Sequence, residues 1–180
     1  QDWTKAGEYL SKYQRLTNTT DKHKLALYKI QEGRSLIHKK KFNESRQTFE
    51  DSLNICGDLA AAYYFIGNAY SAESEEAYQQ SLKNETTIPS DESNSPEQID
   101  QAKELLAKAI PMWVRYAELK PQQAWMVIHL LKDGLFALDR YSEIEDILKQ
   151  ILRIDKDNIE VVASLSEILS HRGEDLEAME

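Results

Sequence analysis

The sequence predicts an all-α protein built from a run of two-helix repeats. Apolar residues recur at three- and four-residue steps along most of the chain, which is the spacing of one helical face. Strand signals are nearly absent, because no sustained period-two alternation occurs and no Asn-Gly or Asp-Gly turn lies between β-branched runs. Similar residues also return 34 positions later, and a fixed period of this length indicates stacked repeats.

The expected elements follow from this period and from helix start and stop signals. Asp21 is expected to cap a helix that begins near Lys22, and Pro121 to end the helix before it. Pro111 lies inside an expected helix and should kink it or start it afresh. We interpret the chain as a single domain and as a piece of a longer protein, since it opens on Gln1. Its predicted parts are the second helix of a truncated repeat at 2–16, repeats at 22–57, 59–121 and 125–156, and a partial repeat at 159–180.

Small and large residues alternate in a fixed order within the repeats. Gly33 and Leu36 return 34 residues later as Gly67 and Tyr70, and Leu131 returns as Leu165. A small residue lets two helices approach closely, and an aromatic residue on the facing helix can fill the resulting notch. Phe42 and Phe49 are the aromatic candidates after Gly33.

This order resembles the tetratricopeptide repeat (TPR) family. That family places Leu-Gly and then Tyr on the first helix, Ala, Phe and Ala on the second, and Pro at the close. Residues 66–70 match the first helix, and Phe42 and Phe49 match the second, with Ser45 and Ser52 in place of alanines. The resemblance implies a right-handed solenoid of helical hairpins that serves as a scaffold for protein–protein interaction.

A narrower likeness lies in the order of the segments. Trp3 on an orphan helix, the repeat at Gly33, the run Leu-Ala-Ala-Ala-Tyr-Tyr-Phe-Ile-Gly at 59–67, and the Trp113 helix ending at Pro121 follow one another. This order is similar to the TPR scaffold of the bacterial lipopolysaccharide assembly protein B family. The likeness implies a bacterial, cytoplasmic scaffold whose partners regulate or perform envelope lipid synthesis. A membrane helix before this segment and a CxxC pair after it would support the likeness.

The formal net charge of −9 is concentrated in one region. Residues 71–101 hold eight acidic residues and one basic residue, a charge of −7, so the rest of the chain carries −2. The repeat pattern breaks between Tyr70 and Ala109, which places an insertion at about 71–100 inside one repeat. We predict that 71–82 and 99–106 extend the two helices as a projecting hairpin. The polar stretch 84–97 should form a disordered acidic loop at its tip. If a basic partner exists, this hairpin is the place where we expect it to bind.

Composition excludes several classes of function. The acidic balance argues against a nucleic-acid binder, because the phosphate backbone rewards basic surfaces. No run of 18 apolar residues is present, so we expect no membrane insertion by this segment. A single cysteine, Cys56, leaves no internal disulfide or cysteine-based zinc site, and we expect no cofactor.

The first helices of such repeats line a concave groove, which is the expected binding site. A mixed apolar and polar lining suits an extended peptide or a partner helix, although Met126 and Phe136 could instead be core residues. Asn68 could bond a peptide backbone, because its amide both donates and accepts. A clamp for a partner's C-terminal carboxylates is not expected, since Ile30 and Arg34 stand where its lysine and first asparagine would lie. The groove candidates are Ile30, Arg34, Ile37, Tyr64, Asn68, Met126, His129, Asp133 and Phe136.

Catalysis has little support in the sequence. His129 and Asp133 lie four residues apart on one helix face, and an ordinary ion pair is the expected role. Cys56 has no base near it in the sequence and is expected to be a buried small apolar residue. We therefore expect a non-enzymatic interaction scaffold. The alternative is a structural module of stacked repeats that assembles with further copies of itself.

Overall fold

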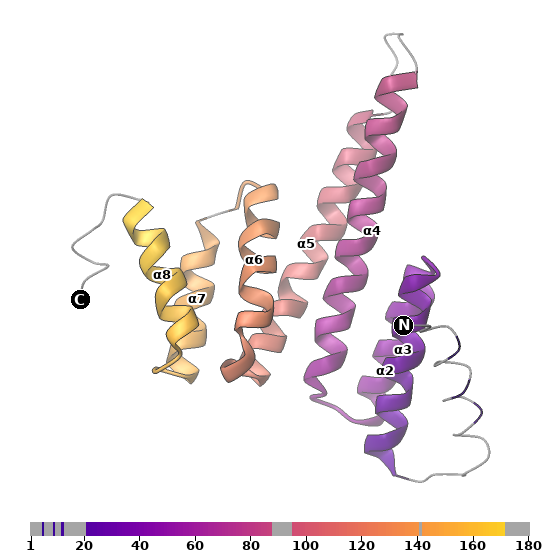
Figure 1. The fold of residues 1–180 in the computed structure, drawn as a ribbon, viewed down its shortest axis with the longest axis horizontal. Helices are drawn as coiled ribbons and strands as arrows, with labels where there is room; N and C mark the ends of the chain where they lie inside the picture. Colours follow the sequence, from indigo (N-terminus) through magenta and orange to yellow (C-terminus); the bar gives the residue numbers. More distant parts are fainter. Residues whose placement is uncertain are drawn as a thin grey trace. The chain divides into compact units, whose positions relative to one another are not determined.

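The computed structural model describes residues 5, 9, 12, 21–87, 95–140 and 142–171. Within these ranges all regular secondary structure is helical and no strand occurs, which confirms the all-α prediction. The helices form two compact units, Gln1–Ala109 and Ile110–Glu180, and the division falls inside α5. The elements are α2 (Lys22–His38), α3 (Phe42–Ile55), α4 (Ala60–Thr87), α5 (Ser95–Leu119), the 3-10 helix η1 (Pro121–Gln123), α6 (Trp125–Ala137), α7 (Glu143–Ile154) and α8 (Ile159–His171) (Figure 1).

These bounds agree with the predicted helix pairs and shorten the predicted loop. The pairs α2–α3, α4–α5 and α6–α7 fall within the three predicted full repeats, and α8 begins at residue 159 as expected. The acidic loop was predicted over 84–97, but α4 continues to Thr87 and α5 begins at Ser95. Residues 88–94 and 172–180 lie outside the described residues. So does the predicted helix 2–16, except that residues 5, 9 and 12 are helical.

The helix ends follow the predicted signals at two points. The Asp21 carboxylate accepts a hydrogen bond of 3.2 Å from the backbone N–H of Lys24, which caps α2. Helix α5 stops at Leu119, and Pro121 opens η1 immediately afterwards. However, α5 passes through Pro111 as one continuous helix, so it does not start afresh there. Proline removes one helical hydrogen bond, and the division between the two units falls next to this position.

The same turn closes the first helix of a pair in both units. Lys40 after α2 and Asp139 after α6 both adopt the left-handed conformation, with φ of 58° and 56°. In each turn the next residue donates a backbone hydrogen bond five residues back, from Lys41 to Leu36 and from Arg140 to Leu135, at 2.9 and 2.8 Å. This arrangement satisfies carbonyl groups that the helix end would otherwise leave without partners.

The core of the first unit is organised around one aromatic side chain. Phe49 of α3 is fully buried, and its ring stacks on Phe65 of α4 with 5.7 Å between the ring centres. The ring also lies against Gly33 of α2, where a Cβ atom would stand only 2.4 Å from it. The Ser45 hydroxyl adds a buried hydrogen bond of 2.9 Å to the Gly33 carbonyl. The small-and-large pairing predicted from the sequence is therefore present between α2 and α3.

A charged side chain forms a second contact between α3 and α4. Arg46 is buried, and its guanidinium carbon lies 4.3 Å from the centre of the Tyr70 ring. It forms an ion pair with Glu73 and a hydrogen bond with Asn43. A guanidinium held between an aromatic face and a carboxylate keeps its charge compensated although little water reaches it.

Helices α4 and α5 extend side by side beyond the α2–α3 pair, as the predicted hairpin requires (Figure 1). Small residues occupy their contact, because Ser74, Ser81 and Ala102 are all buried. The Ser74 hydroxyl donates a hydrogen bond of 2.7 Å to the backbone carbonyl of Ala102. Small side chains allow the two helix backbones to approach closely, and the hydrogen bond satisfies the buried hydroxyl.

The second unit packs an apolar core between α5, α6, α7 and α8. An ion pair stands at the start of α7, where Arg140 donates two hydrogen bonds of 2.7 Å to the Glu143 carboxylate. These hydrogen bonds hold the pKa of Glu143 below its ordinary value. An ionised carboxylate in the first turn also interacts favourably with the helix dipole. The fully or almost fully buried apolar residues of this unit are Trp113, Val127, Leu131, Leu135, Ile144, Leu148, Ile151, Val161 and Ile168.

Substitution of Gly33 tests the close approach of α2 to α3. We expect Gly33→Ala to lower the free energy of unfolding by about 1–3 kcal/mol, because the new methyl group collides with the buried Phe49 ring. This expected loss is the net change, after the roughly 1 kcal/mol that alanine gains over glycine in a helix. Urea unfolding followed by circular dichroism measures the difference.

The matched control is Gly57→Ala, because a Cβ atom at Gly57 meets no atom within 4 Å. This change should leave stability the same or raise it by up to about 1 kcal/mol, through lower entropy of the unfolded chain. Equal unfolding midpoints for the two variants would contradict the close packing at Gly33.

Candidate functional site

The groove residues predicted in the first unit differ in their access to a partner. Ile30 is only 2% exposed and belongs to the core, so its prediction as a groove residue is wrong. It faces inward because α2 buries the stripe that also carries Gly33. Arg34 is half-buried, with its guanidinium carbon 4.9 Å from the centre of the Phe65 ring. The Tyr64 ring stands edge-on to the same ring at 5.1 Å.

Burial and charge act on Arg34 in opposite directions. Burial lowers the pKa of its guanidinium, and the nearby Tyr64 hydroxyl raises it by a smaller amount. The group remains charged at neutral pH, because arginine does not lose its proton in proteins. The structure thus brings Arg34 and Tyr64 together around Phe65. The two remaining candidates in this unit, Ile37 and Asn68, are half-buried.

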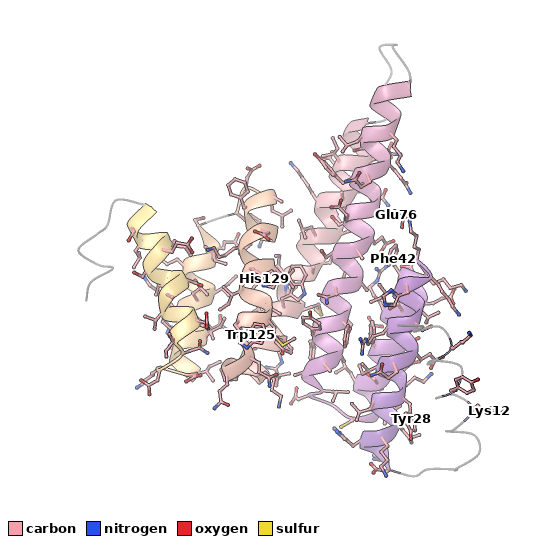
Figure 2. All side chains as sticks on the ribbon, viewed as in Figure 1. Lys12, Tyr28, Phe42, Glu76, Trp125 and His129 are labelled. Atoms are coloured by element: carbon pink, nitrogen blue, oxygen red, sulfur yellow. The ribbon has the colours of Figure 1, made fainter. Side chains whose placement is uncertain are left out.

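Ile37 contributes to a hollow of about 570 Å³ in the first unit. An ion pair of 2.7 Å joins two of its lining residues, Lys40 from the turn after α2 and Glu76 on α4. Glu76 is labelled in Figure 2. Most of the lining is polar or charged, whereas sites for small molecules are lined mainly by apolar and aromatic side chains. The lining residues are Ile37, His38, Lys40, Phe42, Ala72, Glu75, Glu76, Gln79, Gln80 and Lys83.

The predicted residues of the second unit all lie on α6. Met126 is half-buried, and its sulfur lies 3.0 Å from the hydroxyl of buried Tyr116, so it packs partly into the core. Phe136 has 72% of its surface exposed, which excludes the alternative that it is a core residue. His129 and Asp133 are also exposed.

The expected ion pair between His129 and Asp133 is not present within the described residues. Both side chains are exposed, and water can solvate them separately at little cost. His129 instead lines a smaller hollow, which the sequence had not predicted. The i, i+4 spacing correctly placed both residues on one helix but did not determine their contacts.

This smaller hollow, of about 210 Å³, lies between α6 and α8. Trp125 stands beside it with 57% of its surface exposed, and His129 follows one turn later on α6 (Figure 2). Glu160 and Ser164 line it from α8.

The sequence did not predict Trp125 and Glu160 as site residues. A usable signal for Trp125 was its position four residues before His129, on the same helical face. The complete lining is Trp125, Ile128, His129, Lys132, Glu160 and Ser164.

One buried amide fixes the start of α8 near the start of α6. The side-chain N–H of Asn158 donates a hydrogen bond of 2.5 Å to the carbonyl of Pro121, the residue that opens η1 before α6. Its side-chain oxygen accepts a hydrogen bond of 3.2 Å from the backbone N–H of Val161, which caps α8. Trp125 lies four residues after Pro121, and Glu160 two residues after Asn158. The link therefore holds the beginnings of α6 and α8, which carry these two side chains, close together.

An ion pair makes a second connection between the same two helices. Lys132 of α6 pairs with Glu167 of α8, further along both helices. Two of the lining residues carry a permanent charge, Lys132 and Glu160. The charge of Lys132 is already neutralised by Glu167. The other, Glu160, is exposed and makes no hydrogen bond or ion pair with any described residue.

Other kinds of site have less geometric support. In the part of the chain that the structure describes, no group of three or more histidine, cysteine or acidic side chains is placed to hold a metal ion. Cys56 is half-buried instead of buried, and its sulfur lies 3.9 Å from a ring nitrogen of His23. The sequence separation of 33 residues hid this contact. None of the described helices combines the length and the apolar character needed to cross a membrane.

Removal of the Asn158 side chain tests the link that positions α8. We expect Asn158→Ala to lower the free energy of unfolding by about 1–2 kcal/mol, since α8 loses its cap and the Pro121 carbonyl loses its donor. Urea unfolding followed by circular dichroism is the measurement. Asn54→Ala is the control, because Asn54 is exposed on α3 and alanine favours a helix. A midpoint for Asn158→Ala equal to that of the control would show that the link contributes nothing.

Comparison with known proteins gives no functional assignment, so the geometry described above is the basis for one. No family model matches the chain, and no curated protein matches its sequence.

Proposed function

We propose that this chain is a non-catalytic scaffold that binds another protein along an exposed face of α6 and α8. This α6–α8 face is defined by Trp125, His129, Lys132 and Phe136 on α6 and by Glu160 and Ser164 on α8. The observation that carries the proposal is the exposure of two large aromatic side chains on it, 57% for Trp125 and 72% for Phe136. Exposed aromatic residues beside a hollow are typical anchors of protein interfaces.

The spacing of the two aromatic residues favours an extended peptide. Trp125 and Phe136 are 11 residues apart, which is close to three helical turns, so they share one side of α6. At 1.5 Å per residue the separation of their backbones is about 16 Å. An extended chain covers this distance in about five residues, at roughly 3.3 Å each. A partner helix with anchors at equivalent turns would also reach both.

We further propose that the fold is a TPR-type solenoid. Three features support this: helix pairs at the expected bounds, the same turn after α2 and α6, and the contact between Gly33 and Phe49. In keeping with the sequence likeness, the proposed setting is a bacterial cytoplasm. The partner would then belong to the regulation of envelope lipid or lipopolysaccharide assembly.

A second candidate function is self-assembly of stacked repeats. It is favoured by two exposed apolar residues on α8, the last described helix, where Ile159 is 80% and Val162 is 48% exposed. Such a surface could pack on another copy of the chain, as the ends of repeat arrays do when they lack a polar capping face. Light scattering over a range of concentrations detects such association.

Site-specific photocrosslinking tests the proposed face and separates the two functions. A photoreactive phenylalanine analogue replaces Phe136 in the full chain, and in a control it replaces Ile154, which is 52% exposed on α7 and outside the hollow. Irradiation in a bacterial lysate should give discrete adducts of another protein from position 136, and few from position 154. Adducts with the mass of two copies of the chain would instead support self-assembly. The same adduct pattern from both positions would contradict a specific face.

A further inference from the structure

The size of the hollow between α6 and α8 indicates what kind of group it can hold. Its volume of about 210 Å³ is below the roughly 300–1,000 Å³ of typical small-molecule sites. A single long side chain of a partner fits this space better than a complete metabolite does. The hollow is also open at the surface beside Trp125, so such a side chain can enter from a bound peptide.

The charges around the hollow favour a cation. Its one lysine, Lys132, is paired with Glu167. Glu160, on the opposite helix, is exposed and has no ion pair or hydrogen bond with a described residue. An entering cation would therefore meet a carboxylate without displacing an existing partner. An entering anion would have to break the pair between Lys132 and Glu167.

The aromatic wall of the hollow favours the same kind of ligand. Trp125 has 57% of its surface exposed, and tryptophan is the aromatic residue that attracts cations most strongly to its ring face. Arginine suits this combination better than lysine, because its planar guanidinium can stack on an indole and bond a carboxylate through two N–H groups at once. The Ser164 hydroxyl offers a further acceptor at the same place.

We infer that the hollow binds an arginine side chain of the partner, between the Trp125 indole and the Glu160 carboxylate. The inference rests on the proposed function, in which the α6–α8 face binds a peptide. Together with the aromatic spacing, it defines a recognition pattern: an arginine at Trp125 and an apolar residue about five positions away at Phe136. The guanidinium replaces its water shell with one carboxylate, one hydroxyl and an aromatic face.

The test uses the full chain and a short fluorescein-labelled synthetic peptide of glycine and serine. The peptide carries one arginine and one leucine five positions apart, and a matched peptide has citrulline in place of arginine. Citrulline keeps the shape of arginine but has no charge. Fluorescence anisotropy should show roughly three- to tenfold weaker binding of the citrulline peptide.

Variants of the protein locate the effect. Glu160→Gln and Trp125→Leu should each weaken binding of the arginine peptide by roughly three- to tenfold. Binding of the citrulline peptide should stay almost unchanged. Asp157→Asn is the matched control, because it removes the same charge from an exposed position in the same unit that does not line the hollow. Equal weakening by Asp157→Asn and Glu160→Gln would overturn the inference in favour of general charge attraction.

Further outcomes separate this inference from the proposed function. If both peptides bind equally well and both lose binding on Phe136→Ala, the α6–α8 face binds peptides but the arginine site is wrong. If neither peptide binds and position 136 gives no specific crosslinks, both proposals fail. If neither peptide binds although the crosslinks form, the arginine site alone is overturned.

Discussion

The close approach of α2 to α3 at Gly33 is the constraint on which the first unit depends. Because Gly33 has no Cβ, the Phe49 ring occupies the space that a side chain would need. The same ring stacks on Phe65, so one buried side chain fixes three helices relative to one another. With α4 held in this way, Tyr70 meets the Arg46 guanidinium. Helix α4 is also placed to continue alongside α5, far beyond the helix pair on which it is anchored.

The second unit holds its α6–α8 face in place with polar contacts between the two helices. Its apolar core determines which sides of α6 and α8 are buried, and polar contacts further define the alignment of the two helices. Asn158 supplies one such contact, since it caps α8 and bonds the residue that opens the turn before α6. The pair between Lys132 and Glu167 adds a second point of attachment. The hollow beside Trp125 lies on the same two helices, so its shape depends on both contacts.

Local sequence signals predicted the fold better than they predicted the site. The Asp21 cap and the helix bounds were predictable because they depend on residues a few positions apart. The inward position of Ile30 was not predictable. Periodicity shows which residues share one face of a helix, but not which face a neighbouring helix covers. Trp125 and Glu160 were missed for a similar reason. They line one hollow because tertiary packing, including a contact between residues 37 positions apart, brings α6 and α8 together.

Net charge is a poor guide to where a basic partner would bind. The acidic segment 71–101 carries most of the excess charge, which suggested the inserted hairpin. In the structure, however, Glu73 pairs with Arg46 and Glu76 with Lys40, so part of this charge compensates basic residues of the same unit. Specific recognition of a cation needs a carboxylate that lacks an internal partner and a shaped surface beside it. Glu160 meets both conditions although it lies outside the acidic segment, and the indole beside it can distinguish a guanidinium from a simple counter-ion.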